Sequence, residues 1–146
     1  MNYLIVSCLC LIVLCGCQSN KSSVIDDKYF DPSEYTLAEV LKDSEGVKTM
    51  ELYRHKVDTN RFYTKAYWSN GNIQAMMFYT NKRKDGPARS YDTSGRIDFE
   101  GMFLNDVPNG LSIYYKNGEV YSFSIMHNGK ELPLDSSARK KMINGF

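Results

Sequence analysis

The fold is decided by a stretch that recurs along the second half of the chain: YDTSGRIDFEGMFLNDVPNGLSIYY, residues 91–115. It begins with Tyr91 and reaches Gly95 four residues later, with a β-branched residue two positions further on. The same order of residue types starts at Tyr67 and again at Tyr114, so the copies are 24 and then 23 residues apart. Self-similarity at such a period is typical of proteins that stack one supersecondary unit.

Each copy is expected to form a β-hairpin. Its glycines follow Asn, Asp or Ser, and such pairs supply the positive φ angles that tight hairpin turns require. The intervening segments are rich in Tyr, Phe, Ile and Met, with polar residues interleaved. One hairpin cannot bury its own apolar face, whereas stacked hairpins share a continuous one. We therefore expect a mainly β domain, an antiparallel sheet of hairpin repeats, over residues 47–134. Its turns should contain Gly71, Gly86, Gly95, Gly110, Gly118 and Gly129.

The repeats resemble the bacterial variant (variant 2) of the MORN repeat. That pattern combines a tyrosine, an asparagine-glycine pair, a short strand and a second, glycine-containing turn. The copy at 91–115 fits best, with Gly101 and Gly110 in place, and the resemblance covers residues 63–132. The resemblance implies a hairpin array with three repeat aromatics. Many bacterial proteins with such repeats are described as antitoxin-like. These repeat aromatics are Tyr67, Tyr91 and Tyr114.

All four cysteines lie in the first 17 residues, MNYLIVSCLCLIVLCGC, so they cannot cross-link the domain that follows. The uncharged run from Leu4 to Leu14 has the length of a signal-peptide core and is short for a membrane span. The tetrapeptide Leu-Cys-Gly-Cys that ends at Cys17 resembles a bacterial lipobox. This implies removal of residues 1–16 and acylation of Cys17, which anchors a protein stably when two or three chains are attached. An uncleaved anchor and a buried N-terminal helix are the alternatives.

Two segments are expected between the anchor and the repeats: a polar tether at 17–31 and one short helix at 32–46. Asp31 suits the N-cap of that helix, Pro32 its first position and Gly46 its C-terminal end. Its apolar face would consist of Leu37, Val40 and Leu41. After the repeats, residues 135–146 are expected to form a C-terminal tail.

The sequence offers little catalytic chemistry. A net charge of +1 leaves no electrostatic footprint for nucleic acid. His55 and His127 stand in different segments without a thiol partner, and Asp98 and Glu100 fit a solvated strand face better than an acid–base pair. The sequence contains no nucleophile elbow, phosphate-binding loop or paired zinc histidines. We expect no catalytic residue, no metal and no cofactor, and an enzyme is the least favoured class.

The sequence therefore favours a non-catalytic lipoprotein of the cell envelope that acts as a protein-binding or scaffolding module. An immunity or antitoxin-type protein that neutralises a toxin is one alternative, and a structural lipoprotein that binds envelope polymer or lipid is another. In a Gram-negative cell, Gln18 after Cys17 favours the outer membrane, and the lack of an acidic cluster directly after Cys17 favours its periplasmic face. The aromatic residues considered for partner contact are Tyr67, Trp68, Tyr115 and Tyr121.

Overall fold

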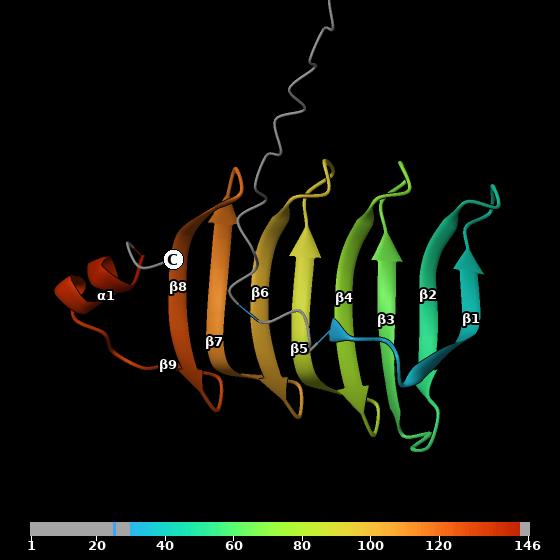
Figure 1. Cartoon of the computed structure of the whole chain (residues 1–146), viewed down its shortest axis with the longest axis horizontal. Helices are drawn as coiled ribbons and strands as arrows, with labels where there is room; N and C mark the ends of the chain where they lie inside the picture. The colour runs from blue at the N-terminus through green and yellow to red at the C-terminus, as the bar shows by residue number, and fades with distance from the viewer. Residues whose placement is uncertain (1–24, 26–29, 144–146) are drawn as a thin grey trace, which may run out of the picture.

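One nine-stranded antiparallel sheet forms the protein, and strands that are neighbours in sequence are neighbours in space (Figure 1). The computed structural model describes Ile25 and residues 30–143. The strands are β1 (Tyr35–Lys42), β2 (Lys48–His55), β3 (Arg61–Tyr67), β4 (Ile73–Thr80), β5 (Arg83–Tyr91), β6 (Ile97–Leu104), β7 (Val107–Lys116), β8 (Glu119–His127) and β9 (Lys130–Glu131). The mainly β, antiparallel fold is thus confirmed, while the expected signal peptide at 1–16 and Cys17 lie outside the described residues.

The short helix expected over 32–46 is not present, because β1 occupies most of this segment. The N–H of Tyr35 donates to the carbonyl of Pro32 at 2.8 Å, which closes a turn, and the chain then pairs with β2. The ring of Tyr35 packs edge-on against Tyr63 and Phe78. An isolated helix of this length is marginal in water. Strand pairing and the packing of one tyrosine therefore outweigh the helix-capping signals.

The hairpin turns lie at the two ends of the sheet and use different residues. At the upper end in Figure 1 each turn contains one glycine with positive φ: Gly46, Gly71, Gly95 and Gly118. At the lower end the two-residue turns are Asn81-Lys82, Asn105-Asp106 and Asn128-Gly129, with both residues at positive φ. That pair of angles defines the type I′ turn, whose twist matches that of the flanking strands.

Gly86 and Gly110, which were expected in turns, lie inside β5 and β7 instead. Their φ angles are 115° and 105°, and at both places the strand register slips past its neighbour. A Cβ on Gly86 would lie 3.2 Å from the Cβ of Phe78. These glycines therefore permit β-bulges, and the asparagines of the lower turns supply the positive φ that the glycines were expected to supply.

The repeat is more regular in space than in sequence. A register shift precedes Tyr67, Tyr91 and Tyr115, which are 24 residues apart. Tyr115, and not Tyr114, is therefore the structural counterpart of the first two tyrosines. The following turn is shorter, since Tyr115 pairs with Val120, five residues on, whereas Tyr91 pairs with Ile97, six residues on. The 23-residue sequence spacing reflects this shorter turn.

Of the chain that precedes β1, Ile25 and Phe30 lie against one face of the sheet (Figure 1). Ile25 bonds to side chains of β5 and β6, Phe30 contacts Phe78 in β4, and Tyr35 contacts Tyr63 in β3. Ile25 and Phe30 are both buried, so this part of the expected tether belongs to the folded domain. The core cluster consists of Ile25, Phe30, Tyr63, Met76 and Phe78.

The expected C-terminal tail contains the helix α1 (Ser136–Ile143), which lies against β8. Its first turn is capped by Asp135, whose carboxylate accepts the N–H of Ser137 at 2.8 Å. Within the described part of the chain, no helix combines the length and the apolar character needed to cross a bilayer.

Candidate functional site

The aromatic residues singled out from the sequence do not converge on one site. Tyr67 and Tyr91 lie on the face that the N-terminal segment crosses, where their hydroxyls donate to Glu51 and to the sulfur of Met76. Tyr114 lies on the opposite face, where its ring packs against Phe99. The indole N–H of Trp68 donates to the Tyr91 carbonyl, Tyr115 bonds to Glu100, and Tyr121 is exposed. Most of these rings therefore hold the sheet together.

A buried ion pair lies at the centre of the covered face. Arg89 in β5 and Glu100 in β6 are cross-strand partners, with guanidinium N–O distances of 2.7 and 2.8 Å. The Tyr115 hydroxyl donates to the second carboxylate oxygen of Glu100, and the Arg89 guanidinium lies 3.9 Å above the ring of Phe30. Glu100, which the sequence placed on a solvated face, is fully buried.

This pair also holds the N-terminal segment. The N–H of Ile25 donates to Glu100 at 3.5 Å, and its carbonyl accepts from Arg89 at 3.2 Å. Both polar groups of one residue's backbone are thus recognised by one charged pair. We call these contacts between Ile25, Arg89 and Glu100 the clamp. A buried pair contributes little net stability, but it specifies one position for the segment that it binds.

A second polar cluster on the same face surrounds Glu51 in β2. Its carboxylate accepts hydrogen bonds from the hydroxyls of Tyr53 and Tyr67 and from the ammonium of Lys48, at 2.5–2.8 Å. Lys48 also lies 3.8 Å from the ring centre of Tyr67. All three donors come from the first three strands, so the cluster fixes the geometry of this end of the sheet.

The cluster shifts the pKa values of its members. Burial raises the pKa of Glu51, but the hydrogen bonds from Lys48, Tyr67 and Tyr53 outweigh it and lower this pKa to about 2. Burial together with the bond to Glu51 raises the pKa of Tyr53 to about 12. Glu51 is therefore a fixed anion that accepts hydrogen bonds, and neither group titrates near neutral pH.

The hydroxyl of Tyr63 is buried and has no hydrogen-bond partner among the described residues. Its ring is sandwiched between Tyr53, at 4.5 Å, and Phe78, at 5.0 Å. Burial raises the pKa of this phenol, which stays neutral. The ring stabilises the core by packing, whereas burial of the hydroxyl without a hydrogen bond lowers the stability.

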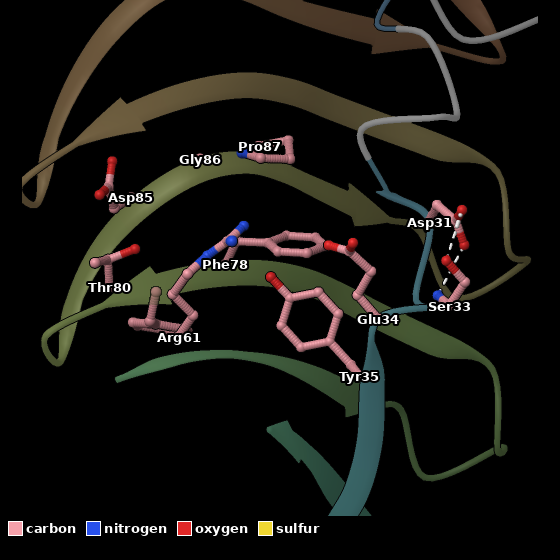
Figure 2. Close-up of a pocket in the computed structure, with 11 residues that line it drawn as sticks. Asp31, Ser33, Glu34, Tyr35, Arg61, Phe78, Thr80, Asp85, Gly86 and Pro87 are labelled. Atoms are coloured by element: carbon pink, nitrogen blue, oxygen red, sulfur yellow. Dashed lines mark hydrogen bonds between the residues drawn. The ribbon is translucent and has the colours of Figure 1, made fainter. Parts of the chain in front are cut away.

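A cleft of about 400 Å³ lies where the N-terminal segment meets the lower ends of β3, β4 and β5 (Figure 2). Tyr35 and Phe78 supply its aromatic lining, and Arg61 and Glu34 enter it from opposite sides in Figure 2. The other lining residues are Asp31, Ser33, Tyr79, Thr80, Asp85, Gly86 and Pro87. The bulge at Gly86 shapes one wall, so the repeat geometry itself creates the cleft.

The charges in the cleft are only partly compensated. Glu34 contacts the Nε2 atom of His55 at 3.3 Å, and Asp31 accepts hydrogen bonds from Ser33. Within the part of the chain that the structure describes, the Arg61 guanidinium and the Asp85 carboxylate have no ion-pair partner. Burial raises the pKa of the Tyr35 hydroxyl, and the nearby Arg61 cation opposes that rise. As far as the described residues show, the cleft thus presents a cation and an anion without ion-pair partners beside aromatic rings.

The candidate catalytic residues are occupied by structural contacts. The Nδ1 atom of His55 accepts the N–H groups of Val57 and Asp58, so its proton lies on Nε2 and faces Glu34. Asp98 accepts the hydroxyl of Ser90, while Glu100 belongs to the clamp. Across Ile25 and residues 30–143, no three His, Cys, Asp or Glu side chains are grouped so as to hold a metal ion.

The residues that matter most here were not singled out by their spacing. No sequence motif marks Arg61, Arg89 or Glu51 as part of a site. The helix prediction places Gly46 at a helix end, whereas the structure places it in the turn between β1 and β2. A signal for Gly46 existed, because it precedes Gly71 by 25 residues, close to the repeat period. The repeat also contains a signal for Arg89, because the equivalent position one repeat later, 24 residues on, is the apolar Ile113.

Comparison with known proteins adds no relative: no family model matches this sequence, and no curated protein matches it either.

Proposed function

We propose that this is a lipid-anchored protein of the cell envelope whose β-repeat domain binds a protein partner without catalysis. The proposal rests on three features. The sequence before Cys17 resembles a lipobox, and the 24-residue MORN-like repeat builds one extended sheet. The third feature, which carries the binding part of the proposal, is the cleft with Arg61, a cation that has no ion-pair partner among the described residues.

Arg61 indicates the chemistry of the bound group. A guanidinium binds a carboxylate through two parallel hydrogen bonds, and it is the cation that proteins use most for this recognition. The hydroxyls of Tyr35 and Thr80 line the same cleft and can donate to the same oxygens. The bound group is therefore a carboxylate: an acidic side chain or a chain terminus of the partner.

Asp85 restricts the partner further. Because this carboxylate lines the cleft without a counter-ion in the described chain, a strongly acidic segment would be repelled. A segment that carries one carboxylate and a neighbouring cation satisfies both Arg61 and Asp85. The aromatic surfaces of Tyr35 and Phe78 favour an apolar residue between the two charges.

The membrane anchor and the binding site are tested separately. For the anchor, Cys17→Ser should move the full-length chain out of the membrane fraction and leave the precursor uncleaved. For the cleft, a photo-cross-linking residue at Thr80 should give a discrete adduct in living cells, and one at Val57, an exposed loop residue, should not.

Charge variants then decide whether the cleft is the binding site. Arg61→Ala should abolish the Thr80 adduct, and Arg61→Lys should weaken it, because an ammonium loses the bidentate geometry. Arg54→Ala, an exposed arginine on the neighbouring strand, is the matched control and should leave the adduct intact. An adduct that survives Arg61→Ala would refute binding through the cleft.

A further inference from the structure

The two edges of the sheet differ. At one edge β9 has only two residues, both charged and exposed, and α1 lies beside β8 (Figure 1). A short, charged and covered edge resists pairing with another strand. At the other edge β1 has eight residues and pairs on one side alone, with β2. The part of β8 beyond β9 is longer, since β9 pairs only with Met126 and His127, but α1 lies beside β8. Among the described residues, β1 is therefore the long edge strand with no element beside it.

The β1 edge also exposes apolar side chains. Leu37, Val40 and Leu41 are 52, 40 and 42% exposed. Leu37 lies opposite Tyr53 and Val40 opposite Glu51, two residues apart in β2, so both project from the covered face. Leu41 lies opposite Met50 and projects from the other face. An added strand would thus bury apolar surface on both faces.

The strand is self-complementary about its centre. A register shift between Leu37 and Glu39 marks a bulge in the middle of β1, with three residues on either side of it. When two such strands run antiparallel with their bulges adjacent, Leu37 of one lies beside Val40 of the other, on the same face, and this occurs twice. On the opposite face, Thr36 of one copy lies beside Leu41 of the other, and this contact also occurs twice.

The charges at the strand ends are mixed in this arrangement. The register that pairs Leu37 with Val40 places Tyr35 opposite Lys42, and it places Glu34 opposite Asp43 and diagonal to Lys42 of the other copy. Asp43, which follows Lys42, is engaged by the N–H groups of Glu45 and Val47. The two exposed Glu39 carboxylates near the axis oppose the pairing, with the modest repulsion expected for like charges in water.

We propose that two copies of this chain associate through antiparallel pairing of their β1 strands, which joins two nine-stranded sheets into one. A closed two-fold dimer follows because the contact is isologous, with the same β1 edge used by both copies. The dimer goes beyond the proposed partner binding and does not depend on the cleft.

The first test is the oligomeric state of the full-length chain in mild detergent. Sedimentation velocity from 1 to 100 µM should show a dimer, and Leu37→Lys with Val40→Lys should shift it to monomer while the circular dichroism spectrum stays β-rich. Leu104→Lys, at a 45% exposed position at the end of β6, should remain dimeric. A wild-type monomer at 100 µM, or a dimer that survives the paired lysines, overturns the proposal.

The second test holds even if the lysine variant fails to fold. Leu37→Cys and Val40→Cys chains carrying different tags are mixed and exposed to a mild oxidant. The mixed disulfide between them should exceed the like-with-like products at least several-fold, and Val57→Cys should give little of either. No preference for the mixed product, or a distinct protein cross-linked to β1 in place of the second copy, contradicts the β1 dimer.

Discussion

Arg89 and Glu100 form an ion pair that is buried in the sheet and also holds both backbone groups of Ile25. The pair bridges β5 and β6 on one side and the N-terminal segment on the other. Removing one charge therefore leaves the other buried without a counter-ion, and it releases the segment as well. The clamp is where the sheet and the N-terminal segment are joined.

We expect Glu100→Gln to lower the free energy of unfolding by about 3–5 kcal/mol, the usual cost of leaving a buried charge unpaired. Urea denaturation of the protein measures it. The matched control is Arg96→Gln, which removes the exposed pair with Asp92 and should cost less than about 1 kcal/mol. The double variant Arg89→Met, Glu100→Leu should recover only part of the loss, because it removes both charges but leaves the Tyr115 hydroxyl and the Ile25 backbone groups without these partners. Equal losses for Glu100→Gln and Arg96→Gln would show that the pair is not buried in solution.

Tyr63 offers the opposite case, because its buried hydroxyl has no partner in the described chain. Tyr63→Phe should keep the stacking with Tyr53 and Phe78 and raise the free energy of unfolding by about 1 kcal/mol, since an unsatisfied polar atom is removed. Tyr53→Phe removes a hydroxyl that bonds to Glu51 and should lower it by a similar amount. Thermal unfolding of the two variants side by side decides the matter: a lower Tm for Tyr63→Phe contradicts the assignment.

The sequence predicted the β class and the antiparallel repeat because turn chemistry and two-residue alternation are local. It did not predict β1, because the segment around Leu37 carries a helix-like pattern that is overruled by pairing with β2. It misplaced Gly86 because a glycine at positive φ serves a bulge as well as a turn. In both cases the local sequence allows two conformations, and pairing with the neighbouring strand determines which one forms.

The buried ion pair of the clamp can be predicted from the sequence when the repeats are aligned by their strand pairing. Arg89 stands where the next copy has Ile113, and Glu100 stands where it has Phe123. Both counterparts are fully buried, so two opposite charges at core positions of adjacent strands predict a buried pair. The cleft cannot be predicted from the sequence, because it depends on where the residues before β1 lie against the sheet.

The type I′ turns yield a further prediction. Lys82 has a φ of 66°, in the left-handed region that a side chain makes costly by about 1–2 kcal/mol. Lys82→Gly should therefore stabilise the protein by about 1 kcal/mol in urea unfolding. Asp106 occupies the matching place in the next turn, but its carboxylate accepts the N–H of Lys84 at 2.8 Å. Asp106→Gly should gain little or lose stability, and an equal gain in both variants would indicate that this hydrogen bond has no effect.

Glu51 makes stability depend on acid. Its pKa falls from 4.5 to about 2 on folding, so below pH 4.5 the unfolded chain takes up a proton that the folded chain refuses. The stabilisation is complete above the unfolded pKa and is lost as pH falls toward 2, by about 2 kcal/mol after solvent screening. Glu51→Gln should therefore be less stable at pH 7 and show a flatter decline between pH 5 and 2. Glu39→Gln, at an exposed position on β1, should keep the wild-type slope. If urea unfolding across this range gives Glu51→Gln and wild type the same slope, the carboxylate is not held by Lys48 and the two tyrosines in solution.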